Sequence, residues 1–161
     1  HRQGVELDAV AIALPHRGEE VAVVVERQLR VEAAVEAHQV AARLQQLKCV
    51  GPVLAATLLA HVPELGKVSA KTLSCLIGVA PHPRQSGNFN GKASIRGGRA
   101  NVRHVLYMAA VAACRSDTRF AATYRALLTI GKAPKLALIA VARKLLVTAN
   151  AMVRDQQTFA C

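Results

Sequence analysis

The chain has 161 residues, of which 52% are hydrophobic and only 3% aromatic, and its formal net charge is +11. An apolar share of this size is enough for a core and excludes a wholly disordered chain. Between Arg84 and Lys144 there are 12 basic residues and one acid, so this block carries the whole excess of positive charge. A basic block on a folded domain favours a nucleic-acid surface, and a solvated basic face that aids solubility is the alternative.

The cysteines and the apolar runs indicate in which cellular compartment the protein is expected. The four cysteines form no C-x-x-C pair, which is typical of buried or free thiols in a reducing compartment. The uncharged run at residues 105–114 is about half of what a bilayer-spanning helix needs, and no signal peptide is visible. We therefore expect no membrane association.

In chain order, a short mixed segment precedes a long helical pattern. Residues 19–47 contain no Pro or Gly, and apolar positions recur there at helical spacing. This predicts one long helix, either a coiled-coil arm or a plain packed helix. The turn Val50-Gly51-Pro52 then begins a second helix, with Pro52 in its first turn.

That turn is similar to the helix-hairpin-helix module, in which backbone N–H groups of a glycine-containing turn bind a phosphate. Gly51 would offer such a contact, although Cys49 stands at the position of the module's first glycine. A tight turn between two helices is the alternative interpretation.

Three further helices follow a loop that is rich in Gly and Pro. Ser69 can cap a helix that reaches about Leu76 and ends at Gly78. Residues 80–98 are predicted to form a long loop, and loops of this length are often functional. Helical patterns return at residues 99–114, 119–128 and 135–154, and no strand alternation is visible. The chain is therefore predicted to be all-α, a compact helical domain.

The loop carries a hydroxyl in basic surroundings. Ser86 is flanked by Arg84 and followed by further cations at Lys92, Arg96, Arg99 and Arg103. Guanidinium groups suit the charge that builds up when a hydroxyl attacks a phosphodiester. A Ser-Gly pair in a loop is nevertheless more typical of a turn than of a nucleophile.

An ordered set of residues favours the nucleophile. From about Leu47 to Arg154 the chain resembles the C-terminal domain of the IS110 family of transposases, grouped with IS116 and IS902. The resemblance rests on Val50-Gly51-Pro52, Ala55, Pro63-Glu64-Leu65-Gly66, Leu76-Ile77-Gly78-Val79-Ala80-Pro81, Ser86-Gly87, Gly98, Arg103, Leu106-Tyr107-Met108-Ala109-Ala110, Gly131-Lys132 and Ala140-Val141-Ala142-Arg143-Lys144-Leu145-Leu146.

The resemblance implies DNA transposition. Ser86 would be the nucleophile that forms a phosphoserine link to a DNA strand. The family also has an N-terminal resolvase-like (RuvC-type) domain whose carboxylates hold Mg²⁺, an element-encoded guide RNA and a homo-oligomeric active unit. A cytoplasmic, nucleoid-associated protein is expected.

The first residues depart from the family pattern. Residues 1–18 resemble a remnant of the end of that nuclease-like domain. Asp8 matches its second metal-binding acid, but Val5 stands where the first should be. One carboxylate makes no credible Mg²⁺ site, so this chain is expected to bind no cofactor and to be inactive alone. Residues 19–46 would be the arm, 47–154 the transposase C-terminal domain and 155–161 a tail.

The leading interpretation is thus the serine-bearing, DNA-binding half of a transposase. A non-catalytic α-helical nucleic-acid-binding module and a helical oligomerisation domain are the alternatives. The expected DNA contacts are Gly51, Arg84, Lys92, Arg96, Arg99, Arg103, Arg143 and Lys144.

Overall fold

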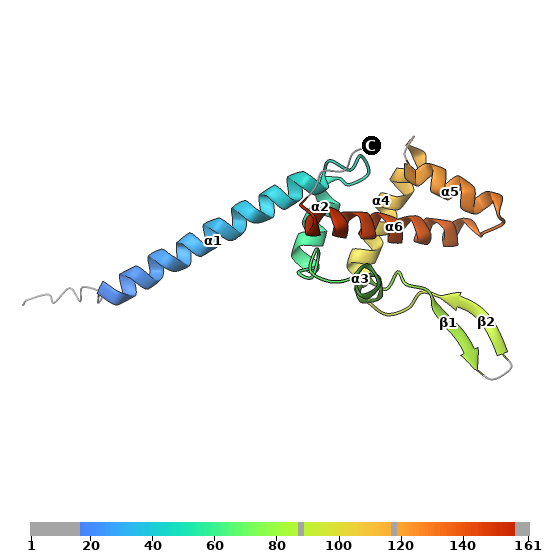
Figure 1. The fold of residues 1–161 in the computed structure, drawn as a ribbon, viewed down its shortest axis with the longest axis horizontal. Coiled ribbons are helices and arrows are strands. Elements are labelled where there is room, and N and C mark those ends of the chain that lie inside the picture. Colours follow the sequence, from blue (N-terminus) through green and yellow to red (C-terminus); the bar gives the residue numbers. More distant parts are fainter. Residues whose placement is uncertain (1–16, 87–88, 117–118, 157–161) are drawn as a thin grey trace, which may run out of the picture. The chain divides into compact units, whose positions relative to one another are not determined.

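The computed structural model describes residues 17–86, 89–116 and 119–156, with the backbone alone for residues 17–21, 83–86 and 89–93. Residues up to Glu36 form one unit, and those from Ala37 onward form a second, larger one. The elements in chain order are α1 (Arg17–Leu44), α2 (Pro52–His61), α3 (Ala70–Ile77), β1 (His82–Ser86), β2 (Phe89–Ser94), α4 (Ala100–Arg115), α5 (Arg119–Thr129) and α6 (Pro134–Arg154) (Figure 1).

Helix α1 confirms the prediction of one long helix. Pairs one turn apart support its exposed part: Arg30 donates to Glu26 at 2.9 Å, and Gln28 donates to Glu32 at 3.0 Å. Large apolar side chains, Val24 and Leu29 among them, lie exposed on it. The last turns belong to the larger unit, where Leu44 is fully buried.

Local signals set the ends of the next two helices as predicted. Helix α2 begins with Pro52 after the N-cap Gly51, and it buries Leu54 and Leu58. The Ser69 hydroxyl caps α3 by accepting a hydrogen bond from the backbone N–H of Thr72 at 3.2 Å.

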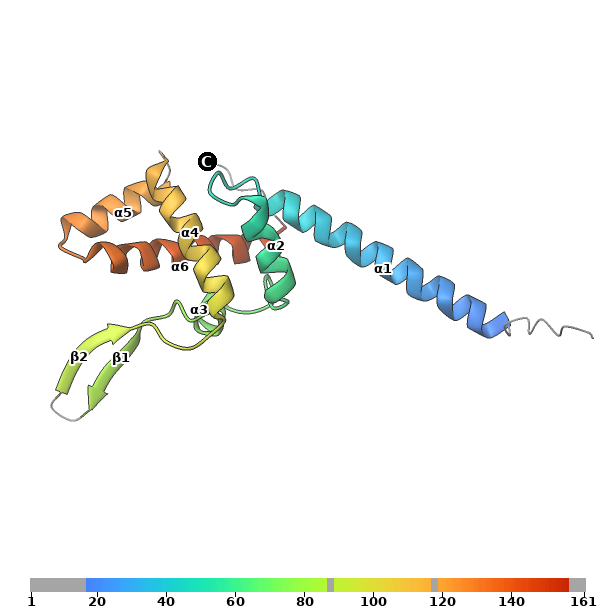
Figure 2. The same ribbon diagram turned by 180° about the vertical axis from the view of Figure 1, so that it is seen from behind.

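The core of the larger unit lies where α6 packs against α3, α4 and α5, while α4 also contacts α2, α3 and α5. Figure 2 shows α4 crossing α6. Leu106 of α4 and Leu145 and Leu146 of α6 are fully buried, and small residues such as Ala110 and Ala149 let the helices approach closely. The predicted all-α fold is confirmed.

Helix α6 is the one helix among the described residues that is long and apolar enough to cross a membrane by length and composition. Eight of its residues are buried inside the domain, which is how the central helix of a folded core behaves. One of the eight is polar: the Asn150 amide accepts from Gly66 N–H at 2.7 Å and donates to the Val68 carbonyl at 3.1 Å. This side chain ties α6 to the loop between α2 and α3.

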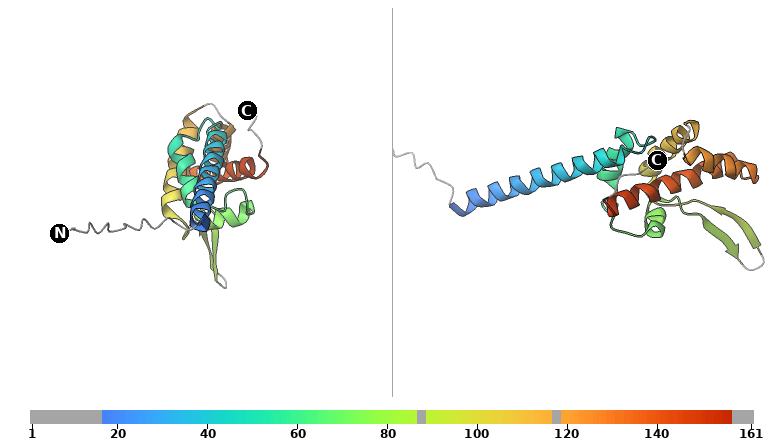
Figure 3. Two further views of the ribbon diagram at one scale, coloured as in Figure 1. Left: turned by 90° about the vertical axis from the view of Figure 1, so that its left-hand side faces the viewer. Right: turned by 45° about the horizontal axis from the view of Figure 1, so that its top comes forward.

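The prediction of a plain loop at residues 80–98 is wrong, because this segment contains an antiparallel hairpin. Strand β1 pairs with β2, Ser86 opposite Phe89 and His82 opposite Ser94, with a register shift between His82 and Arg84. Pro83 lies at that shift, and a proline cannot donate to a strand ladder. Neither strand packs on a helix within the described residues, and Figure 3 shows the hairpin extending away from them.

The hydrophobic pattern of the sequence did not predict the hairpin, and the reason is physical. With no helix beneath it, neither strand needs an apolar face, so the alternation that marks a half-buried strand is missing. The local signal that remains is Gly87-Asn88 between the two strands, a dipeptide typical of two-residue hairpin loops.

Two glycines let the chain cross itself at the base of the hairpin. Gly78 ends α3 with φ +79°, and Gly98 precedes α4 with φ +70°. A Cβ on Gly98 would collide with the backbone of Ile77 and Gly78, and a Cβ on Gly78 would meet the Gly97 carbonyl. The entering and leaving segments therefore touch backbone to backbone.

We expect Gly98→Ala to lower the free energy of unfolding in urea by about 2–5 kcal/mol. The left-handed backbone contributes about 1–2 kcal/mol and the collision with α3 the remainder. Gly97→Ala is the matched control, because Gly97 has φ +66° but open space at its Cβ. It should lose only about 1–2 kcal/mol. Equal losses in the two variants would contradict the backbone crossing.

Candidate nucleic-acid interface

The base of the hairpin is held by α3 and α4. The Arg103 guanidinium donates to the carbonyl of Gly97, and at 3.3 Å to that of Ile77. The backbone N–H of Arg99 donates to the Leu76 carbonyl at 3.1 Å. These bonds join the end of α3 to the start of α4, so the two ends of the hairpin leave the domain from a fixed point.

A second arginine forms the central ion pair of this region. Arg99 binds Glu64 through two parallel hydrogen bonds of 2.7 Å each, and about a third of each side chain is exposed. The hydrogen bond from Arg99 lowers the pKa of the Glu64 carboxyl from 4.5 to about 2. Glu64 therefore stays ionised near neutral pH and orients Arg99 at the start of α4.

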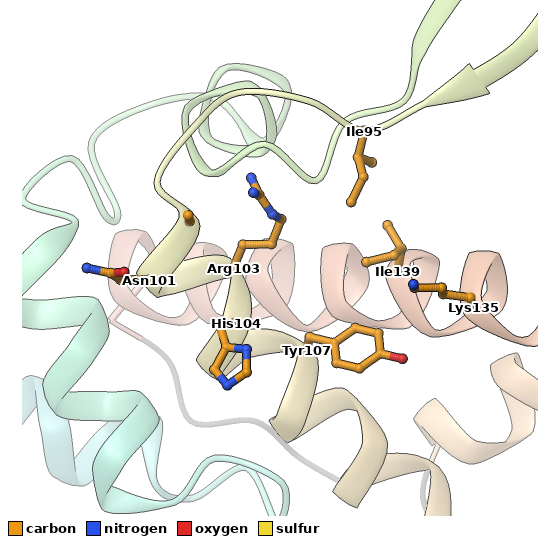
Figure 4. A pocket seen from close by; sticks show the side chains of 8 residues that line it. Ile95, Asn101, Arg103, His104, Tyr107, Lys135 and Ile139 are labelled. Carbon is orange, nitrogen blue, oxygen red and sulfur yellow. The ribbon is translucent and has the colours of Figure 1, made fainter.

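Three cavities adjoin one another around the hairpin base. One of about 450 Å³ lies between α4 and α6, with Ile95 from the segment after β2 on its wall (Figure 4). A second, of about 420 Å³, shares Ala100 and Asn101 with it. A third, of about 620 Å³, shares Ile95 and Ile139 with it. We call these three cavities together the basal groove.

The lining of the basal groove is basic. No Asp or Glu side chain of the described residues lines it. The imidazole and cationic groups that line it are His61, Arg99, Arg103, His104, Lys135, Arg143 and Lys144. A concave surface lined by one sign of charge concentrates an anionic ligand.

Four of the predicted contact residues come together here. Arg99 lines the 420 Å³ cavity, Arg103 the 450 Å³ cavity, and Arg143 and Lys144 the 620 Å³ cavity. Lys144 also donates to the Thr123 hydroxyl at 2.8 Å, which fixes its ammonium group against α5.

The other predicted residues lie apart from this groove. Arg96 is exposed between β2 and α4 but lines none of the three cavities. Gly51 caps α2 with φ −79°, a conformation open to any residue, so no special glycine geometry supports a helix-hairpin-helix contact there.

The remaining predicted site residues, apart from Asp8, lie in the hairpin. Ser86 is the last residue of β1, while Arg84 and Lys92 lie within the two strands. Asp8 lies outside the described residues. No group of three or more His, Cys, Asp or Glu that could hold a metal ion occurs in the described part of the chain.

Several lining residues were missed by the sequence prediction, among them His104, Tyr107 and Lys135. His104 and Tyr107 share a face of α4, three positions apart, and Lys135 comes from the first turn of α6. The spacing of His104 and Tyr107 after Arg103 was a usable signal. Lys135 could not be assigned to the same cavity, because only tertiary packing brings α6 to α4.

Protonation of Glu64 should weaken the folded state. Its pKa is lowered on folding, so its stabilisation is complete above about pH 4.5 and is lost as the pH falls toward about 2. In urea unfolding between pH 7 and 2, the stability difference between wild type and Glu64→Gln should shrink over that range. Arg99→Gln removes the donor and should show the same convergence. A constant difference would mean that the ion pair does not set this pKa.

Comparison with known proteins identifies the family. No curated protein matches the chain. The profile of the transposase IS116/IS110/IS902 family matches residues 41–125, which is more than half of the sequence and includes the complete hairpin. The match confirms the resemblance that the sequence analysis found. Membership of this family supports a role in transposition and implies an interaction with DNA. The chain belongs to the IS116/IS110/IS902 family of transposases.

Proposed function

We propose that this chain is the DNA-binding, serine-bearing part of a transposase and that Ser86 is its nucleophile. The observation that carries the proposal is that the family match spans the whole hairpin, which presents Ser86 at the end of β1. The basic groove at the foot of the same hairpin supports it, because a phosphate backbone is the polyanion that such a surface binds.

The proposed step is a phosphoryl transfer to the protein. The Ser86 oxygen forms a bond to a DNA phosphorus, and one P–O ester bond of that phosphodiester breaks. The serine loses its proton, and the departing strand end leaves as a hydroxyl, so the proton count balances. A second strand hydroxyl can later displace the serine and restore a phosphodiester.

The residues of the groove would bind and orient DNA during this step. Arg143 and Lys144 project from α6 and Arg103 from the first turn of α4, so phosphates could be held on two helices at once. Arg99 lies beside them, with two of its N–H donors already bound to Glu64. Arginine forks neutralise phosphate oxygens well, and they do so in a fixed geometry when the side chain is already held.

A family Mg²⁺ site does not fit the described residues. Mg²⁺ requires a set of oxygen ligands, usually carboxylates, and no metal-binding cluster occurs among the described side chains. Glu64, which contacts the groove residue Arg99, is already paired with it. We propose that the family's Mg²⁺ is held by residues outside the described ones, and no step above depends on it, on the guide RNA or on a homo-oligomeric assembly.

The nucleophile can be tested by covalent trapping. A nicked suicide substrate is incubated with the chain, and in parallel with a family member that contains the nuclease-like domain, and adducts are resolved under denaturing conditions. Ser86→Ala, and the same change at the equivalent serine of that family member, should abolish the adduct. Ser94→Ala is the matched control, since Ser94 ends the other strand of the hairpin.

The outcomes separate the candidate functions. A serine-to-alanine variant of that family member that still forms the adduct would rule out this serine as nucleophile. If neither wild-type protein forms an adduct while both bind DNA with the same affinity as their Ala variants, the non-catalytic nucleic-acid-binding module is the correct function.

The groove makes a separate prediction about salt. Replacing both Arg143 and Lys144 by Gln should weaken DNA binding and reduce the slope of log affinity against log salt by about 1 per lost phosphate contact. Arg115→Gln/Lys132→Gln is the control, because it removes the same charge from exposed positions that line none of the three cavities. An equal change of slope in both double variants, measured by fluorescence polarisation, would contradict a localised groove.

A further inference from the structure

The 450 Å³ cavity between α4 and α6 differs from the rest of the basal groove. Its walls combine a phenol ring, an imidazole, two cations and two isoleucines (Figure 4). Its volume falls in the range of small-molecule sites, roughly 300–1,000 Å³. A double helix cannot enter a cavity of that size, but one nucleotide can.

The aromatic wall is distinctive in this chain. There are only two tyrosines and no tryptophan. Tyr124 packs against the hydrophobic core, whereas Tyr107 is half-buried on the cavity wall. The Tyr107 hydroxyl makes no hydrogen bond to another described residue, and Ile95 and Ile139 line the same cavity as its ring. These surfaces suit a flat, largely apolar ring.

The polar wall suits a phosphate. Arg103, His104 and Lys135 line the cavity, and none of the acidic side chains that the structure describes does. Arg103 uses one guanidinium nitrogen on backbone carbonyls and has further N–H donors. His104 and Lys135 are exposed, and no salt bridge in the described structure involves either of them. Positive charge beside a stacking platform is the combination that binds single-stranded nucleic acid.

We propose that this cavity binds one unpaired nucleotide, with its base against Tyr107 and its phosphate between Arg103 and Lys135. The proposal rests on the proposed DNA-binding function and adds a site for a single-stranded segment. Tyr107 and Lys135 act as positioning residues. Strand β2 runs from Phe89 to Ser94, about 17 Å at roughly 3.3 Å per residue, so the cavity lies well away from the hairpin tip.

The test measures binding of the intact chain to three labelled probes of equal length. The probes are an oligo-dT strand, an oligo-U strand and a DNA duplex. Binding is measured by fluorescence polarisation at one salt concentration. Tyr107→Leu should weaken the better-bound single strand roughly 10-fold, the effect of losing one stacked base, and change duplex binding less than about twofold. Tyr107→Phe keeps the ring and should retain wild-type affinity.

Matched variants separate the site from general effects. Met108→Leu changes the next residue of α4, which is 53% exposed and does not line the cavity, and it should change nothing. Lys135→Gln should weaken single-strand binding more than duplex binding. Lys132→Gln removes the same charge outside the cavity and should leave the ratio of the two affinities unchanged.

Each outcome decides the proposal. A selective loss for Tyr107→Leu supports it, and the probe that shows the larger loss identifies the strand as DNA or RNA. Equal losses on strand and duplex, or no loss in Tyr107→Leu, overturn the nucleotide site while the proposed DNA-binding function stands. If wild type binds none of the three probes, the DNA-binding function itself fails. Thermal unfolding of each variant confirms that it is folded.

Discussion

The backbone crossing of Gly78 and Gly98 is the constraint on which the rest of the larger unit depends. It brings the end of α3 against the segment that enters α4, with no side chain between them. Arg103 then bonds to carbonyls on both sides of the crossing. As a result the hairpin leaves the domain from one defined point, the first turn of α4 lies beside that point, and the three cavities of the basal groove surround it.

The electrostatics of the region follow from this geometry. Two arginines that the sequence assigns to phosphate contacts, Arg99 and Arg103, already hold protein partners. These partners already fix the orientation of both guanidinium groups, and each guanidinium still has further N–H donors. His104 and Lys135 are exposed beside them on the cavity wall. The start of α4 therefore combines arginines that hold the fold together with exposed basic side chains on the cavity wall.

Much of the helical architecture could be predicted because its signals are local. Pro52, Ser69 and Gly78 each act on a helix end through their own backbone or hydroxyl, and the structure places the helix ends at these residues. The hairpin could not be predicted in this way, since its strands bury no apolar face and pair only with each other. The same limit applies to the site. The sequence analysis identified Arg143 and Lys144 as basic residues. That they line the same cavity as Ile95 and Pro81 depends on tertiary packing.

The sequence by itself determined the helical class, the basic block and the family, because composition, helix ends and an ordered set of motif residues are all properties of the chain read in order. Only the tertiary structure decided that Arg99 pairs with Glu64 and that Tyr107 shares a cavity with Lys135. Those contacts join residues far apart in the sequence. They exist because α4 and α6 pack together and because two glycines allow the chain to cross itself at the foot of the hairpin.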